Sequence, residues 1–506
     1  MKPGRIAAIL AFTLLAAACR PITTTQDPVQ TVSDGGVDPF EFAWSDRSLH
    51  AQAWLGSSYD PAIDLSRASD YRMEVFIDED FQSVSGRQRV HYTNNEDQPL
   101  DQLYMRLFPN LAGGEARVSA IKVDGRAVEP VYEAQMSAVM IALGEALSPG
   151  ESLVLELDFS TTIPREMEGN YGLFGYFDGF LVLDTFYPMI PVHDDQGWQR
   201  ETTPPNGDPT YNDISFYLVQ VHAPAGLSLL ATGTEIDRRL VNDEQIVTFA
   251  SGPARDFYIA ASENLELLEA NVGETVVRSY APARFSEHSR LVLDSGVAAL
   301  KVFEGRFGDY PYTEMELVST PMQALGIEYP GLMAMNLNMY DPGAMIAGVP
   351  SSIYLEGTVA HEVAHQWFYN LVGNDQVQEP WLDEALAQYA TYLYYLDSYG
   401  EGAAASYQQS WSERWDRADR AEIPIGLPAG EYRGAEYSAI VYGRGPLFIA
   451  EVARQLGDES MEALLRQYVD SHAWGIASGE SFRQLVEDVC ACELDAMFAD
   501  WVDGTQ

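Results

Sequence analysis

Two histidines and a glutamate form a compact group of residues that could do metal chemistry. His361 and His365 are four positions apart, and Glu362 directly follows the first histidine. Side chains four positions apart on an α-helix lie on one face, so both imidazoles can reach a single zinc ion. Glu362 lies about 100° round the helix from His361, where it can face the open position of the metal instead of binding it. The spacing therefore predicts a catalytic metal centre.

A third ligand is predicted at Glu384, which follows His365 with 18 residues between them. Two histidines and one carboxylate leave zinc a fourth position for water, as catalytic sites require. The metal lowers the pKa of this water, so Glu362 can act as general base and later return the proton to the leaving amine. Asp383 and Glu379 are alternative third ligands, and both lie close to Glu384 in the sequence.

Two helices must carry these ligands. The segment Ser351–Val372 is long enough for a helix and stops at Gly373, a residue favoured just past a helix C-terminus. Pro380 suits a first helical turn, and the following segment runs without a breaker to Gly400.

The chain before these helices has the alternation of β-strands. Alternate residues are apolar in Tyr71–Ile77 and in Leu153–Phe159, and Asp124-Gly125 and Pro149-Gly150 separate such runs as turns. We therefore expect an N-terminal β domain over residues 46–262. Beyond about residue 285 the period becomes helical, and residues 263–506 are expected to form the catalytic domain.

Composition and the N-terminus bear on partners and location. The 75 acidic and 30 basic residues give a net charge of −45, which argues against nucleic acid as a partner. Positive residues, a short apolar run and small residues before Cys19 resemble a bacterial lipoprotein signal over residues 1–19. Residues 20–45 are expected to form a flexible tether. The protein is therefore expected to be an extracytoplasmic, membrane-anchored lipoprotein, or otherwise secreted, and Cys490 and Cys492 are left as a local disulfide or free thiols.

The sequence around the zinc ligands resembles the aminopeptidase N family of zinc metallopeptidases. That family has an HExxH helix followed at this spacing by a WLNEG-like helix, matched here by Trp381-Leu382-Asp383-Glu384-Ala385. Asp383 replaces the usual asparagine and Ala385 the usual glycine. The segments Leu107–Asn110 and Gly252–Phe257 also resemble the family. The resemblance implies a multi-domain α+β fold, with an N-terminal antiparallel β-sandwich followed by a thermolysin-like, mainly helical zinc-peptidase domain.

The same resemblance implies two further site residues. Glu328, in Leu325-Gly326-Ile327-Glu328-Tyr329, matches the glutamate of the family's GAMEN motif that holds the free α-amine of the substrate, although Ile327 and Tyr329 depart from that motif. The alternative is a surface carboxylate before a turn. Tyr442 matches the tyrosine that donates a hydrogen bond to the tetrahedral intermediate, with Tyr437 as the alternative. Backbone donors around Gly331 are further candidates for peptide binding.

The expected function is a zinc-dependent aminopeptidase with one zinc ion per chain. It would remove N-terminal residues from peptides with a free N-terminus, by attack of zinc-bound water with Glu362 as general base. A zinc endopeptidase with the same centre, or a non-catalytic lipid-anchored binding protein, are the alternatives.

Overall fold

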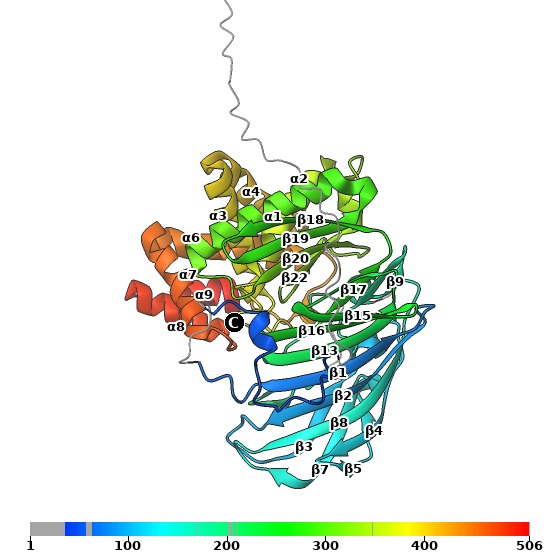
Figure 1. The fold of residues 1–506 in the computed structure, drawn as a ribbon. Coiled ribbons are helices and arrows are strands. Elements are labelled where there is room, and N and C mark those ends of the chain that lie inside the picture. Colours follow the sequence, from blue (N-terminus) through cyan, green and yellow to red (C-terminus); the bar gives the residue numbers. More distant parts are fainter. Residues whose placement is uncertain are drawn as a thin grey trace, which may run out of the picture.

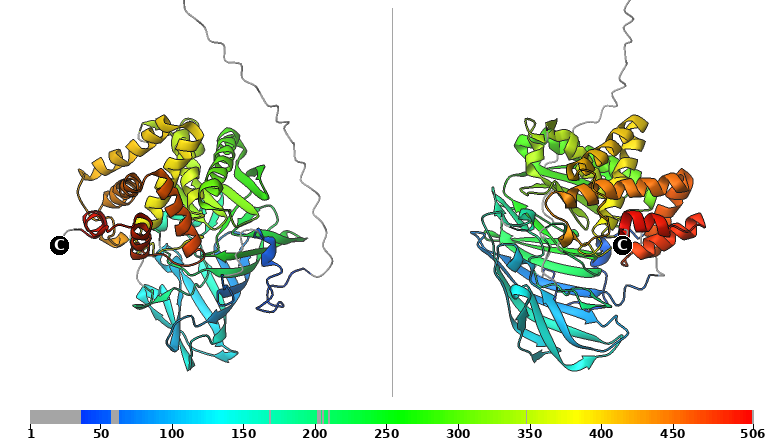
Figure 2. Two further views of the ribbon diagram at one scale, coloured as in Figure 1. Left: turned by 90° about the vertical axis from the view of Figure 1, so that its left-hand side faces the viewer. Right: turned by 180° about the vertical axis from the view of Figure 1, so that it is seen from behind.

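A β-rich part and a mainly helical part make up the computed structural model, which describes residues 36–56, 63–167, 169–200, 204, 206–208, 210–346 and 348–504. The sandwich strands gather at one end of the molecule, and most helices lie at the other end together with strands β18 to β22 (Figure 1; Figure 2). Cys19 and the predicted signal segment lie outside the described residues. Within the described residues, no helix combines the length and apolar character needed to cross a membrane.

The largest sheet of the β-rich part has eight strands in the order β15-β16-β13-β1-β2-β8-β4-β5. The predicted apolar stripes of β1 (Ser69–Ile77) and β8 (Ser152–Thr162) are buried, which confirms both strands. All pairs in this sheet are antiparallel except β1 with β13. The remaining strands are β2 (Ser83–Thr93), β4 (Ala116–Val123), β5 (Arg126–Ala127), β13 (Ser215–Pro224), β15 (Thr234–Val241) and β16 (Glu244–Ala254).

Two smaller sheets share a hydrophobic core with the large one, which confirms the predicted sandwich. The predicted turns also form: Asp124 and Gly125 both have positive φ, at 47° and 76°, as the tight hairpin between β4 and β5 requires. One small sheet contains β9 (Phe174–Phe177), β10 (Phe180–Leu183), β14 (Ser228–Ala231) and β17 (Ile259–Ser262), and the other β3 (Leu100–Arg106), β6 (Val131–Glu133) and β7 (Ala138–Leu147). Two short hairpins are formed by β11 (His193–Asp194) with β12 (Gly197–Trp198) and by β23 (Met345–Ile346) with β24 (Val349–Pro350).

A five-stranded sheet, in the order β18-β19-β20-β22-β21, lies between the sandwich strands and the ligand helices in sequence. Three of its strands follow residue 285, so the prediction that the period becomes helical beyond about residue 285 is wrong for this stretch. These strands are short and mostly buried, and a short apolar run does not distinguish a buried strand from a helix. The strands are β18 (Leu265–Val272), β19 (Thr275–Pro282), β20 (Glu314–Thr320), β21 (Gly326–Tyr329) and β22 (Leu332–Asn336). The domain boundary at residue 262 stays a prediction.

Helices α1, α2 and α3 pack together beside this sheet and form one core with the later helices. The second predicted ligand helix, α3 (Trp381–Tyr399), is confirmed and ends before Gly400. The first is shorter than predicted, because α2 (Ser351–Ala364) ends before Val372. The other helices are α1 (Ser286–Phe307), α4 (Glu401–Trp415), α5 (Glu436–Ala439), α6 (Gly445–Leu456), α7 (Asp458–His472), α8 (Gly479–Cys490) and α9 (Asp495–Phe498), with a π-helical turn η9 (Ile440–Arg444) between α5 and α6.

A contact with the β-rich part holds the chain after α2 in a non-helical turn. The Arg255 guanidinium donates to the carbonyl oxygens of Tyr369 and Asn370 at 2.6 and 3.1 Å, and Tyr369 has φ of 150°. Gly373 is not a helix cap: a Cβ at this position would overlap the Arg255 guanidinium. A residue distant in sequence thus competes for backbone groups that a longer helix would use.

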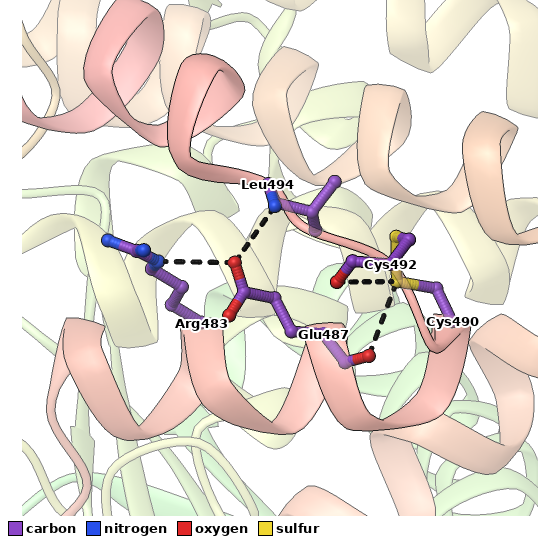
Figure 3. Close-up of a disulfide and its surroundings, with 5 residues drawn as sticks. All are labelled: Arg483, Glu487, Cys490, Cys492 and Leu494. Atoms are coloured by element: carbon purple, nitrogen blue, oxygen red, sulfur yellow. Dashed lines mark hydrogen bonds and ion pairs between the residues drawn. A yellow bond between two sulfur atoms is a disulfide. The ribbon is translucent and has the colours of Figure 1, made fainter.

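Cys490 and Cys492 form a disulfide at the end of α8 (Figure 3), which resolves the alternatives left by the sequence. Ala491 between them has φ of 50°. The Glu487 side chain accepts from the Leu494 N–H at 2.8 Å and lies 3.4 Å from Arg483. These contacts join α8 to the start of α9.

Candidate active site

The three predicted metal ligands converge on one point. His361 Nε2 and His365 Nε2 are 3.2 Å apart, and Glu384 Oε2 lies 3.1 Å from the first and 3.5 Å from the second. Ligands at about 2.0–2.1 Å around a tetrahedral zinc ion are separated by roughly 3.3 Å, so the spacing of these donors fits zinc. All three side chains are buried. The set can therefore hold one ion and leave a position open.

The two alternative third ligands are occupied elsewhere. Asp383 accepts hydrogen bonds from Asn374 and Gln376, at 3.0 and 2.9 Å. Glu379 accepts from the Gly479 N–H at 3.0 Å, at the start of α8. Glu384 is thus the carboxylate of this stretch that faces the histidines.

A second group of metal-binding residue types shares one histidine with the first, and consists of Glu328, Glu362 and His365. His365 Nδ1 lies 2.8 Å from the Phe368 carbonyl oxygen. If Nδ1–H donates this hydrogen bond, Nε2 is unprotonated and its lone pair can bind a metal. Nε2 faces His361 and Glu384. The geometry therefore favours the first group as the ligands.

The other partner of each histidine comes from outside α2. Phe368, which orients His365, belongs to the turn that Arg255 holds through the adjacent Tyr369 carbonyl. The Tyr369 hydroxyl also donates to Asp256. The Gln388 amide lies 3.5 Å from His361 Nδ1. The β-rich part thus helps to set the position of His365.

Glu362 is buried beside the strand that carries Glu328. A Cβ at Gly326 would overlap the Glu362 carboxylate, so the first residue of β21 must be small. Burial, with the charge of Glu328, raises the pKa of Glu362 well above its ordinary value. A carboxylate whose pKa is raised in this way is better suited to exchange protons near neutral pH.

Glu328 is not a surface carboxylate. It lies on β21, is 6 % exposed, and accepts from Gln376 Nε2 at 3.2 Å. Its carboxylate is 4.0 Å from His365 Nδ1, so it borders the metal ligands. Burial raises the pKa of Glu328, and Asp383 and Asp208 add negative charge nearby. This side of the site suits a cation.

Tyr442 is closer to the metal ligands than Tyr437. Its hydroxyl donates to Glu384, and its ring centroid lies 6.1 Å from that of His361. Burial, together with the charge of Glu384, raises the pKa of Tyr442 well above its ordinary value, so it stays a donor. Tyr437 packs against Tyr442 with 5.9 Å between ring centroids, while its hydroxyl faces Gly207.

Some polar residues of the site carried no recognisable signal in the sequence. Gln376 bridges Glu328 and Asp383, and Gln388 joins His361 to the Tyr407 hydroxyl. Neither residue belongs to a motif that the sequence analysis identified. The predicted donor at Gly331 is already used, since its N–H donates to Gln366 at 2.8 Å.

Comparison with known proteins places this geometry in context. Residues 291–501 match the peptidase family M1 domain. Aminopeptidase M1-B of Oryza sativa subsp. japonica is 23 % identical over 75 % of this chain and 45 % of its own length, and aminopeptidase N of Lactobacillus delbrueckii subsp. lactis is 23 % identical over 86 % and 50 %. The chain thus spans about half the length of these relatives.

A solved structure shares the fold over most of both chains. The M1 zinc metallopeptidase from Deinococcus radiodurans superposes with a TM-score of 0.63 at 21 % identity, covering 87 % of this chain and 95 % of its own. The two-part architecture is therefore also found in a known structure. The resemblance to the aminopeptidase N family seen in the sequence is confirmed.

The close approach of β21 to Glu362 gives a test of the site. We expect Gly326→Ala to displace the Glu362 carboxylate while the ligands still bind metal, because the three atoms nearest to the added Cβ all belong to Glu362. A displacement of about 1 Å costs roughly 10²-fold in rate. Peptide-bond hydrolysis and metal content measured on the same preparation would check this. Gly305→Ala on α1, where a Cβ has open space, is the matched control. Unchanged hydrolysis in Gly326→Ala would contradict this placement of Glu362.

Proposed function

We propose that this protein, whose residues 291–501 match the peptidase family M1 domain, is a zinc-dependent aminopeptidase acting on peptides with a free N-terminus. The observation that carries the proposal is a buried carboxylate, Glu328, that borders the three converging metal-binding side chains. A metal group alone would suit any zinc peptidase. The added anionic group suits a substrate with a positive charge next to the scissile bond.

Glu362 performs the proton transfers in the proposed mechanism. A zinc ion held by His361, His365 and Glu384 supplies Lewis-acid chemistry and lowers the pKa of water. Glu362 accepts the proton of the attacking water and then delivers it to the nitrogen of the leaving amine. Its burial keeps the carboxylate away from bulk solvent, so the same proton can be passed on.

Glu328 positions the substrate. Its carboxylate pairs with the α-ammonium group, and Gln376 keeps the carboxylate oriented. An ion pair at this place leaves one residue between the charge and the scissile bond, so the enzyme removes single N-terminal residues.

Tyr442 stabilises the transition state. In the structure its hydroxyl donates to Glu384. We propose that it turns to the oxygen of the scissile carbonyl as negative charge develops there, which is worth most in a buried site.

The relatives support a peptide substrate. Those compared above are aminopeptidases, and a variant of the Deinococcus radiodurans enzyme has been solved bound to a Tyr-Ser-Ala substrate. No observation favours the endopeptidase or the binding protein over this proposal.

Metal content and turnover of the ligand and base variants test the mechanism together. His361→Ala, His365→Ala and Glu384→Ala should each lose the zinc, because three protein ligands are the minimum for a catalytic site. Glu362→Gln should keep one zinc per chain and lose about 10²- to 10⁴-fold in kcat. Atomic emission on purified protein and hydrolysis of an aminoacyl arylamide are the measurements.

Glu379→Gln is the control for the ligand variants, since it removes a neighbouring carboxylate that caps α8. It should retain zinc. If Glu379→Gln lost zinc while Glu384→Ala kept it, the third ligand would be Glu379 and not Glu384. Near-normal turnover in Glu362→Gln would contradict the proposed mechanism.

The pairing of Glu328 with a free N-terminus is tested by a double cycle of enzyme and substrate. Glu328→Ala should weaken transition-state binding of a free peptide by roughly 2–5 kcal/mol, because it breaks a desolvated charge pair. The N-acetylated peptide should be poor for both enzymes, so the coupling between the two changes is large. Glu287→Gln, which removes an exposed carboxylate on α1, should show no coupling with N-acetylation of the substrate. A coupling near zero for Glu328, with blocked peptides cut at internal bonds, would favour an endopeptidase.

We further propose that Cys19 is lipidated and anchors the exported protein to a membrane, from the signal-like sequence before it. The wild-type protein should partition into the detergent phase in Triton X-114, and Cys19→Ser should move to the aqueous phase or keep its signal segment. Mass spectrometry of the N-terminus provides the check. Unmodified wild-type protein in the aqueous phase would count against the anchor.

A further inference from the structure

A lone arginine borders the site on the side away from Glu328. Arg414 lies near the end of α4, and its guanidinium carbon is 5.4 Å from the ring centroid of Tyr442. The side chain is partly buried. In the part of the chain that the structure describes, its guanidinium has no carboxylate or carbonyl partner.

The packing of α4 holds Arg414 in this place. Gly443, next to Tyr442 on η9, approaches α4 so closely that a Cβ would lie 2.9 Å from the Trp411 carbonyl oxygen and 3.0 Å from the Trp415 nitrogen. Arg414 lies between these two tryptophans on the same helix. The glycine therefore fixes the distance between Arg414 and the tyrosine that contacts Glu384.

The charge of Arg414 is directed at the site and is not neutralised elsewhere. Burial lowers the pKa of its guanidinium, while the nearby Tyr407, Tyr442 and Glu384 oppose this shift. Arg444, also close in sequence to Tyr442, differs, because its guanidinium donates to carbonyl oxygens of the C-terminal segment. Arg414 is thus available to an anionic ligand.

The charged groups of the site lie in a definite order. Glu328, which accepts from Gln376, lies next to His365, and His365 lies next to His361. His361 lies near Tyr442, and Tyr442 lies against Arg414. The amine-binding carboxylate therefore adjoins the metal-binding residues at His365, whereas the arginine adjoins them through Tyr442, at the other end of this series of contacts. A substrate whose N-terminus is held at Glu328 extends away from that carboxylate, so the residues that can reach Arg414 are those after its first one.

We propose that Arg414 binds a carboxylate on the leaving-group side of the scissile bond, so that short peptides with a free C-terminus are the preferred substrates. This inference rests on the proposed aminopeptidase function. The planar guanidinium matches a carboxylate through two parallel hydrogen bonds. Each residue after the scissile bond extends the chain by at most about 3.6 Å, so the terminal carboxylate of a dipeptide or tripeptide reaches a group beside Tyr442, and that of a longer peptide passes it.

The experiment compares three substrates that differ only on the leaving side: Leu-Ala, Leu-Ala-NH₂ and Leu-Asp-NH₂. The wild-type enzyme should prefer Leu-Ala over Leu-Ala-NH₂ by about 10- to 100-fold in kcat/KM, mainly through KM, as expected for a charged hydrogen-bonded pair. In Arg414→Gln this ratio should fall close to one. Arg414→Lys should give an intermediate ratio, because it keeps the charge without the planar fork.

Arg417→Gln is the matched control, since it removes an exposed positive charge three residues along the chain. It should keep the wild-type ratio. A preference for Leu-Asp-NH₂ that Arg414→Gln also abolishes would assign the carboxylate to an acidic side chain at the second position, and still support the site.

Equal loss on all three substrates in Arg414→Gln would overturn the inference, because the arginine would then act through Tyr442 alone. A wild-type enzyme that shows no preference between the free acid and the amide would overturn it as well. Failure of the proposed function is distinguishable, since the wild-type enzyme would then cleave none of the three substrates yet cut N-terminally blocked peptides. Circular dichroism of each variant would exclude unfolding as the cause of a loss.

Discussion

The contact of Arg255 with the turn after α2 is the interaction on which the site most depends. The guanidinium is buried and donates to carbonyl oxygens of Tyr369, Asn370, Asn212 and Gly475, which come from both parts of the chain. Hydrogen bonds from a charged donor contribute about 1.5–3 kcal/mol each, and these also compensate for the burial of the charge. Because Phe368 belongs to this turn, the contact joins the packing of the β-rich part to the orientation of His365. The metal-binding geometry is therefore a property of both parts of the molecule.

Electrostatic repulsion among buried carboxylates is the second constraint. Glu328, Glu362, Asp383 and Glu384 are all buried within one site, and burial disfavours their ionised forms. Interactions with the neighbouring His361 and His365 outweigh burial for Glu384 and lower its pKa below its ordinary value, while burial raises the pKa of the other three. A divalent cation and a substrate ammonium group would therefore favour the ionised forms of these carboxylates. Arg414, by contrast, is positively charged. It lies beside Tyr442, whereas Glu328 lies beside His365.

Local patterns in the sequence determined the parts of this protein whose geometry depends on near neighbours. The four-residue spacing of His361 and His365, the extent of α3 and the alternation in β1 and β8 follow from helical and strand periodicity, which acts over a few residues. His361, His365 and Glu362 could be identified for the same reason, whereas Glu384 was predicted from its spacing to His365 in the sequence. The roles of Glu328 and Tyr442 were accessible through motif resemblance only, and the structure adds that both side chains adjoin the metal-binding group.

Tertiary structure decided everything that requires residues distant in sequence to meet. Arg255 holds the non-helical turn after α2, and β21, which carries Glu328, pairs with β22. The need for glycine at position 326 arises from Glu362 on another element, and Arg414 meets Tyr442 because Gly443 lets α4 approach η9. No periodicity encodes such contacts, since they arise when separate elements are packed at van der Waals distance. The sequence alone therefore determined which residues could bind a metal, and only the packed fold decided which charges surround it.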